Sequence, residues 1–296
     1  MVIIQRSYNE RQDFQPIMDF LTQTYLETGN IDNWFPTRFE SSRNEYPGNT
    51  FVWEDLNTGS IVAVANPESN IIYVLQIHPD YEYLTTEMAR MVEKNFRKNR
   101  PKSETTDKFA IVLVEGNRAR EKGLKEAGFK KGHVCGFIRF RDVNAPIPDE
   151  PTPTGYRIRT ITDEDDENYV TIIQDIFGHG ESFDVDYVQY LKCSSFYKSD
   201  LDLVAVDEKD NFASVCTFRF DPASRVTELE PMGTHPAHRG KGLAKALLTE
   251  GFRRLQKYNP SLLFIGGAAN NPGANRLYDV TGFVEKKALV LWVKEV

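Results

Sequence analysis

The 296-residue sequence has few cysteines, no excess of positive charge and no long apolar run near its start. The three cysteines, Cys135, Cys193 and Cys216, are scattered. They fit neither a disulfide framework nor a paired-cysteine zinc site, and they predict a reducing cytosol. Basic residues number 36 and acidic residues 43, and this net charge of −7 argues against binding to nucleic acid or to an anionic membrane. The opening MVIIQRSYNERQDF turns polar too early for a signal peptide or a membrane span. We therefore expect a cytoplasmic protein.

The composition that remains is that of folded, globular domains. Apolar residues make up 40% of the chain and charged residues 27%, and the length suits two domains better than one. The segment 142–155, DVNAPIPDEPTPTG, is rich in proline, which excludes a helix and a central strand. We expect it to be a linker between a domain at 1–141 and a domain at 156–296.

An internal repeat relates the two halves. His78 and the proline after it correspond to His235 and its proline, at an offset of 235 − 78 = 157. Further on, NRAREKGLKEAGF from Asn117 corresponds to NPGANRLYDVTGF from Asn271, at an offset of 271 − 117 = 154. Two matches in the same order at nearly the same offset predict one fold used twice.

The apolar patterns of the second half predict a mixed sheet with helices on its faces, an α/β or α+β architecture. Strands are expected around 156–160, 201–207, 212–220, 226–234, 261–269 and 288–293, and helices around 162–176, 185–197, 242–258 and 271–280. Pro231 predicts a bulge or a local break in pairing in the fourth strand. Four basic residues of the third helix are expected on its solvated face: Lys245, Arg253, Arg254 and Lys257.

The junction before the third helix is suited to a phosphate. Its residues are Arg239, Gly240, Lys241, Gly242, Leu243 and Ala244. A helix start offers unsatisfied N–H groups and partial positive charge, and glycines there allow an anion to approach closely. The P-loop pattern fails because His235 stands at its first glycine, and the dinucleotide fingerprint fails at Lys245.

Two motifs of this half resemble the GNAT acetyltransferase superfamily. They are Arg239-x-x-Gly242-x-Ala244 after a His-Pro step, and Asn271-x-x-Ala274-x-x-Leu277-Tyr278 followed by Gly282-Phe283. The resemblance covers about 156–296, extends weakly to the first half, and is strongest to the tandem two-domain members. It implies two GNAT-like acyl-CoA N-acyltransferase domains that use acetyl-CoA as cosubstrate.

The resemblance also implies where acetyl-CoA binds, between two central parallel strands that separate. Met232, Gly233 and Thr234 would offer backbone groups to the pantetheine arm, and 239–244 would bind the pyrophosphate. Asn271 would lie beside the cofactor on the next strand. Tyr278 matches the tyrosine that commonly protonates the departing thiolate, and the alternative is that its ring only packs beside Phe283.

A primary amine must lose a proton before it attacks a thioester, so a base is needed near this opening. Glu228 and Glu230 share a face of a regular strand, although Pro231 disturbs the geometry beyond them. We favour Glu230 as the base, and the alternative is that both carboxylates are structural or on the surface. Backbone N–H groups at the bulge would stabilise the oxyanion.

Other reactive side chains have simpler interpretations. His235 and His238 lack a nearby third ligand, so no metal site is expected and His235 is expected to shape the turn. Cys193 paired with His179 would make a nucleophile, but a buried structural cysteine is the favoured interpretation. An acidic cluster between the first two helices would attract a cationic amine, or is a solvated loop: Glu181, Asp184 and Asp186.

The first half lacks the residues that carry the resemblance. Glu82, Thr85 and Glu87 stand where Arg239, Gly242 and Ala244 stand, and Leu124 stands where Tyr278 stands. Carboxylates there would repel a pyrophosphate. The first domain is therefore predicted to be degenerate, without a cofactor site, and to have a structural or substrate-shaping role.

The leading hypothesis is an N-acetyltransferase that moves an acetyl group from acetyl-CoA to a primary amine of a small molecule or peptide. Transfer would occur by direct attack in a ternary complex, in a monomer. The first alternative is a non-catalytic CoA-binding sensor or scaffold. A cofactor-free interaction module is the second, and the glycines and Arg239 argue against it.

Overall fold

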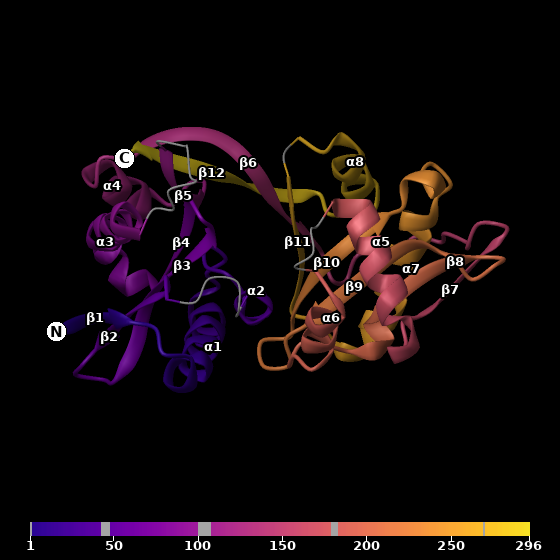
Figure 1. The fold of residues 1–296 in the computed structure, drawn as a ribbon, viewed down its shortest axis with the longest axis horizontal. Coiled ribbons are helices and arrows are strands. Elements are labelled where there is room, and N and C mark those ends of the chain that lie inside the picture. The colour runs from indigo at the N-terminus through magenta and orange to yellow at the C-terminus, as the bar shows by residue number, and fades with distance from the viewer. Residues whose placement is uncertain (1, 43–47, 100–107, 179–182, 269) are drawn as a thin grey trace. The chain divides into compact units, whose positions relative to one another are not determined.

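The structure, a computed structural model, describes residues 2–42, 48–99, 108–178, 183–268 and 270–296. It divides into two compact units, and in each of them helices cover both faces of a sheet (Figure 1). Unit 1 comprises Met1–Phe137, Ala268–Asn270 and Lys287–Val296, and unit 2 comprises Ile138–Gly267 and Asn271–Lys286. The mixed α/β class expected from the sequence is confirmed.

Unit 1 has the strand order β1-β2-β3-β4-β5-β12-β6. Its strands are β1 (Ile3–Ser7), β2 (Phe51–Asp55), β3 (Ser60–Ser69), β4 (Ile72–Ile77), β5 (Lys108–Val114), β12 (Glu285–Glu295) and most of β6 (Lys130–Arg141), and its helices are α1 (Glu10–Thr28), α2 (Pro36–Ser41), the 3-10 turn η1 (Pro79–Leu84), α3 (Thr85–Asn99) and α4 (Arg118–Glu126). Alternation along β2 fills both faces: Val52 packs with α1, while Trp53 packs with α3 and α4.

Strand β12 belongs to the sheet of unit 1 although it follows unit 2 in the chain. Leu289–Glu295 pairs antiparallel with Lys108–Val114 of β5. Val290 and Trp292 are each 1% exposed and lie in the core of unit 1. The strand expected at 288–293 is therefore present, but it completes the sheet of unit 1 and not that of the second half. The units consequently differ from a simple division of the chain at 142–155.

Unit 2 has the strand order β11-β10-β9-β8-β7. Its strands are β7 (Tyr156–Thr160), β8 (Asp202–Asp207), β9 (Phe212–Phe220), β10 (Val226–Thr234) and β11 (Leu262–Ala268), its helices are α5 (Asp166–Phe177), α6 (Val185–Lys192), α7 (Leu243–Leu255) and α8 (Pro272–Val280), and its 3-10 turns are η2 (Asp163–Asp165), η3 (Ser199–Leu201), η4 (Pro236–His238) and η5 (Gln256–Tyr258). Helices α5 and α6 lie in front of these strands in Figure 1. Leu247 of α7 packs with Phe218 of β9 in one hydrophobic cluster of this unit.

The helices and strands of unit 2 follow the sequence pattern closely, except that α6 ends at Lys192 and not near residue 197. Residues 142–155 form neither helix nor strand, and they pack on unit 2 through Val143 and Ile147. Glu150 pairs with Lys245 of α7, and an Asp149 oxygen lies 3.4 Å from Arg253. The basic face of α7, expected to be solvated, is thus partly covered by the proline-rich segment.

Membrane insertion through a helix finds no support in the described residues, where no helix has the length and apolar character that crossing a bilayer requires.

Candidate active site

The central feature of unit 2 is a strand edge that opens. Strands β10 and β11 pair in parallel only from Val226 to Glu228, opposite Leu262–Phe264. Strand β10 continues to Thr234, still paired with β9 on its other side, and its register shifts between Leu229 and Met232. The bulge predicted at Pro231 is therefore present. Beyond Glu228, no further ladder pairs join β10 to β11 among the described residues, so this edge of β10 is open on its β11 side.

Met232, Gly233 and Thr234 form the far end of this opened edge. Helix α5 packs directly on the bulge, since a Cβ at Gly233 would lie 2.6 Å from a side-chain carbon of Ile176. The Gly233 carbonyl accepts a hydrogen bond from Ser214, at 2.7 Å. Glycine at 233 thus permits close packing of helix on strand.

The chain leaves β10 through a tight turn that ends at the start of α7. Nδ1 of His235 accepts a hydrogen bond from the N–H of Ala237, so this histidine shapes the turn as expected. Gly240 and Gly242 have φ values of 78° and 85°, in the left-handed region that favours glycine. Gly242 is the N-cap of α7 and provides no side-chain cap. The first N–H groups of a 13-residue helix are thereby left for another acceptor.

Two exposed basic side chains flank this helix start. Nε of Arg239 donates to the Thr234 carbonyl at 3.1 Å, which fixes the arginine against the end of β10. Nζ of Lys241 donates to the Tyr156 hydroxyl at 2.8 Å, and that hydroxyl lies 2.8 Å from Nδ1 of His238. Burial, with Lys241 and His235 nearby, lowers the pKa of His238. A neutral His238 can accept from Tyr156, so the lysine, tyrosine and histidine form one directed chain of hydrogen bonds.

Tyr278 of α8 lies at the β11 side of the opening. A Cβ at Gly267 of β11 would be 3.7 Å from its ring, and the side chain is 6% exposed. Burial raises the pKa of Tyr278 well above its usual value, with smaller contributions from Glu230 and Cys216. The hydroxyl is therefore protonated at any physiological pH. Its ring also contacts Phe283, at 5.8 Å between centroids, so packing and an available proton coexist in one residue.

The two candidate bases differ in exposure. Glu228 is 6% exposed within the paired part of β10, opposite Arg219 of β9. Glu230 is half-buried at the bulge, and its charge contributes to the raised pKa of Tyr278. Only Glu230 therefore combines a position at the opening with access to solvent.

Asn271 is not on the strand, where it was expected, but caps α8. Its Oδ1 accepts a hydrogen bond from the N–H of Ala274 at 3.1 Å. The sequence signal was an asparagine directly before Pro272, a residue favoured in the first helical turn. This cap sets the start of the helix that carries Tyr278.

The remaining sequence candidates either have other positions than expected or lie outside the described residues. Cys193 is exposed just beyond α6 and not buried as expected, because Val188 and Leu191 carry the apolar face of that helix. His179 and Glu181 lie outside the described residues. Asp184 serves as the N-cap of α6, accepting from the N–H of Tyr187. Within the described ranges, no group of three His, Cys, Asp or Glu side chains could hold a metal ion.

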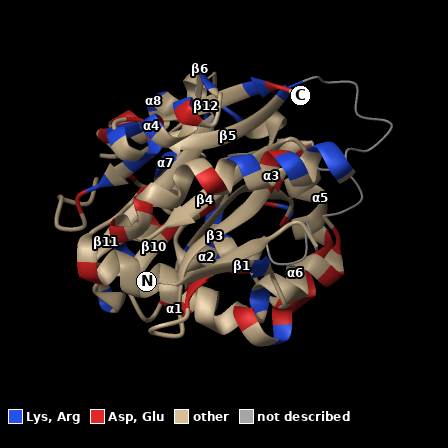
Figure 2. Cartoon of the chain, turned by 90° about the vertical axis from the view of Figure 1, so that its left-hand side faces the viewer, with Lys and Arg blue, Asp and Glu red and all other residues tan. Residues whose placement is uncertain are grey.

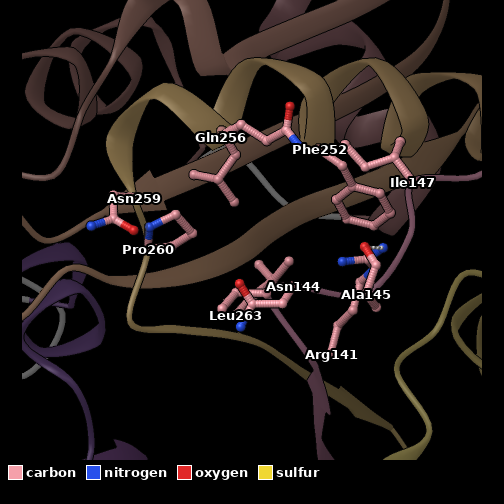
Figure 3. Close-up of a pocket in the computed structure, with 11 residues that line it drawn as sticks. Arg141, Asn144, Ala145, Ile147, Phe252, Gln256, Asn259, Pro260 and Leu263 are labelled. Atoms are coloured by element: carbon pink, nitrogen blue, oxygen red, sulfur yellow. Dashed lines mark hydrogen bonds between the residues drawn. The ribbon is translucent and has the colours of Figure 1, made fainter.

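A pocket of about 320 Å³ lies at the opposite end of α7 from the glycine turn (Figure 3). The guanidinium of Arg141 lies over the ring of Phe252, at 4.3 Å from the centroid. Its nitrogens donate to main-chain carbonyls, among them those of Thr281 and Ala145. The arginine thus ties main-chain segments together and is not free to bind an anion.

We call the turn from Arg239 to Ala244 the cradle. The residues of unit 1 that correspond to it have structural partners. Glu82 pairs with Arg120, and Glu87 accepts a hydrogen bond from the indole N–H of Trp53 at 2.9 Å. Leu124, at the place of Tyr278, is fully buried. Figure 2 shows acidic and basic residues along α3, whose first turn is acidic, whereas the first turn of α7 has no acidic residue.

An opened strand edge that leads into an uncapped helix start suits an extended ligand with an anionic end. The model of the acetyltransferase (GNAT) family matches residues 166–283, a segment that includes the opening and the start of α7. Mycothiol acetyltransferase of Renibacterium salmoninarum is 28% identical over 166 residues, which span 53% of this chain and 49% of that protein. The chain therefore matches about half the length of this relative.

Solved structures resemble the whole chain in fold. A GCN5-related N-acetyltransferase from Sphaerobacter thermophilus aligns with 99% of this chain and 95% of its own, with a TM-score of 0.69 and 17% identity. A tandem GNAT protein from the clavulanic acid biosynthesis pathway aligns with 99% of this chain and 98% of its own chain, with a TM-score of 0.69 and 15% identity. The prediction of a tandem GNAT fold is thereby confirmed.

Proposed function

We propose that unit 2 is an acetyl-CoA-dependent N-acetyltransferase. It transfers the acetyl group to a primary amine of a small molecule or peptide by direct attack in a ternary complex. One observation carries the proposal: the part of β10 that no longer pairs with β11 leads directly to the start of α7 at Gly242, which has no side-chain cap. A long ligand with a phosphate at one end matches that arrangement.

In this proposal the backbone of Met232–Thr234 binds the pantetheine arm, and the turn from Arg239 to Ala244 binds the pyrophosphate. Asn271 acts through the cap of α8 and holds Tyr278 against β11. Arg239 and Lys241 supply positive charge beside the helix start, where both are exposed. No metal has a part in this chemistry.

Glu230 and Tyr278 move the protons. Glu230 accepts a proton from the ammonium form of the acceptor, directly or through water, and the free amine attacks the thioester carbonyl. The C–N bond forms, the C–S bond breaks, and the sulfur leaves with the bonding electron pair. Tyr278 donates its proton to that sulfur, and the second proton that the nitrogen loses as the amide forms passes through water to the Tyr278 phenolate. Its raised pKa keeps the proton available until negative charge develops nearby.

Calorimetric titration with acetyl-CoA tests the cradle. We expect one site per chain in the wild type, and a loss of affinity of at least about 100-fold, or about 3 kcal/mol, in Gly242→Glu. A side chain at a φ of 85° is strained, and the carboxylate would face the phosphates. Gly59→Glu is the matched control, because Gly59 also has a positive φ with open space around it, but lies in unit 1. Equal affinity in Gly242→Glu and Gly59→Glu would mean that the cradle is elsewhere.

A non-catalytic CoA sensor or scaffold is the second candidate, since cofactor binding alone needs only the cradle. A panel of primary amines separates the two proposals, because a sensor binds acetyl-CoA without releasing CoA. The Renibacterium relative is named a mycothiol acetyltransferase, so the acetyl acceptor that this name implies belongs in that panel. The protonated hydroxyl of Tyr278 favours the enzyme, because simple binding has no use for it.

A further inference from the structure

Unit 1 repeats the strand opening of unit 2. Strands β4 and β5 pair in parallel only from Ile72 to Val74, opposite Ala110–Val112. Strand β4 continues to Ile77 and into the His78 turn, as β10 continues to Thr234 and His235. In both units, three paired residues are followed by a separation of two central strands.

The opening in unit 1 contains a side chain of the protein itself. Nη1 of Arg120 donates to the Leu75 carbonyl at 3.2 Å, and Nη2 donates to the Ile77 carbonyl at 2.7 Å. Oδ1 of Asn33 accepts from the Ile77 N–H at 2.9 Å, and its Nδ2 donates to the Ile77 carbonyl. The backbone groups that β4 loses as partners of β5 are thus satisfied by Arg120 and Asn33.

This arginine is fully enclosed and its charge is paired. Arg120 is 1% exposed, and its Nε lies 3.2 Å from Oε1 of Glu82. Asn117 donates to both Glu82 and Asp32, at 2.7 Å each. Burial lowers the pKa of Arg120, whereas Asp32 and Glu82 act in the opposite direction. A guanidinium keeps its charge in such surroundings, so the cluster is a complete polar network and not a defect.

The internal repeat shows how the two openings come to differ. At the offset of 154, Asn117 corresponds to Asn271 and Arg120 corresponds to Ala274. Both asparagines cap their helices in the same way, each accepting from the N–H three residues later at 3.1 Å. The backbone frame is therefore shared, and one side chain fills the first opening where alanine leaves the second one free.

We propose that Arg120 is a built-in occupant of the unit 1 opening, and that replacing it with alanine creates a binding site for a small guanidinium. The ligand would take over the hydrogen bonds to Leu75 and Ile77 and the ion pair with Glu82. This proposal concerns unit 1 alone and does not depend on acetyl transfer by unit 2.

Thermal unfolding of the full chain tests it, with methylguanidinium chloride as the probe and sodium chloride at equal ionic strength as the reference. We expect the Tm of Arg120→Ala to fall well below that of the wild type, and methylguanidinium at millimolar concentration to restore several degrees in a saturable manner. The matched control is Arg118→Ala, because Arg118 is exposed on the same helix. Its Tm should be close to that of the wild type and unaffected by the probe. Equal probe effects on both variants, or none on Arg120→Ala, would overturn the proposal.

A second variant covers the case in which Arg120→Ala does not fold. In Arg120→Lys a single ammonium cannot bridge the two carbonyls in the geometry of a guanidinium fork. We expect faster hydrogen exchange at the Ile77 N–H, because its acceptor Asn33 is held by Arg120 at 2.9 Å. Exchange at the wild-type rate would show that the arginine does not organise this opening.

Discussion

Tyr278 combines tight packing with the proton that the proposed mechanism requires. Its ring contacts Phe283 and faces the side of Gly267 where a Cβ would lie 3.7 Å away, so packing restricts the position of the hydroxyl. Burial raises the pKa of Tyr278 because the charged phenolate would lose its hydration. The proton therefore stays on the hydroxyl in the resting protein, and the proposed reaction would draw it off only as negative charge develops on the departing sulfur. The two interpretations offered by the sequence are therefore compatible.

Replacing Tyr278 with phenylalanine should lower kcat about 100-fold or more, with little change in the affinity for acetyl-CoA. The ring and its packing remain, and only the proton donor is lost. Steady-state kinetics with calorimetry measures both quantities. Tyr258→Phe is the control, since it removes a tyrosine hydroxyl, which donates a part-buried hydrogen bond to Asp200 at 2.5 Å, without touching the opening. Unchanged turnover in Tyr278→Phe would remove its role as the acid.

Some residue roles could be inferred from the sequence and others could not. The glycines at 240 and 242 were recognisable because a turn before a helix requires residues that tolerate positive φ. Arg120 gave no such signal, because it lies among other charged residues in a helix that looks exposed. Its burial depends on a gap between two strands, which is a property of tertiary structure.

At the scale of elements, the start of α5 depends on one carboxylate. Asp165 accepts two hydrogen bonds from Arg159, at 2.6 and 2.9 Å, and also binds the N–H of Thr162 at 2.8 Å. The hydrogen bonds from Arg159 contribute most to lowering the pKa of Asp165, to about 2. Thr162 was expected to begin this helix, and the structure adds the reciprocal bond from its N–H to Asp165.

Asp165→Asn should therefore cost about 2 kcal/mol in the free energy of unfolding at neutral pH. The lowered pKa means that the folded state binds the proton less readily, so the stabilisation is present above the unfolded pKa of about 3.8. It is lost as pH falls through about 2. Urea unfolding at several pH values should show the two proteins converging below pH 4. Asp163→Asn, which changes an almost fully exposed neighbour, should behave like the wild type at every pH.

Sequence patterns located most elements of unit 2 because apolar periodicity and capping residues are local. The role of the proline-rich segment was not local. Its prolines correctly excluded helix and strand, but the contact of Glu150 with Lys245 joins residues far apart in sequence. A charged residue opposite another on a separate element leaves no trace in either segment alone.

At the scale of the whole molecule, the sheet of unit 1 depends on a strand from beyond unit 2. Trp292 of β12 stands opposite Ile111 of β5 and lies in the same core as Met88 and Phe109. Lys294 donates to the carbonyl of Ala127 at 2.8 Å and pairs with Glu93 of α3. The sequence predicted this strand but not its place, because periodicity identifies a buried strand without naming its neighbour.

Trp292→Ala should lower the free energy of unfolding of unit 1 by about 3–5 kcal/mol, since it removes a fully buried aromatic side chain. Hydrogen exchange with mass spectrometry should show lost protection in α3, α4 and β5, and little change in α7. Lys287→Ala, at an exposed position of the same strand, is the control. Loss of protection first in unit 2 would contradict the placement of β12.

The position of β12 also sets an order for biosynthesis. A ribosome releases unit 1 first, yet β5 and β6 lack the strand between them until all of unit 2 has been translated. During that interval two strand edges in the middle of a sheet are unpaired and open to misassociation with other nascent chains. The half of the protein that is made first is thus the half that is finished last.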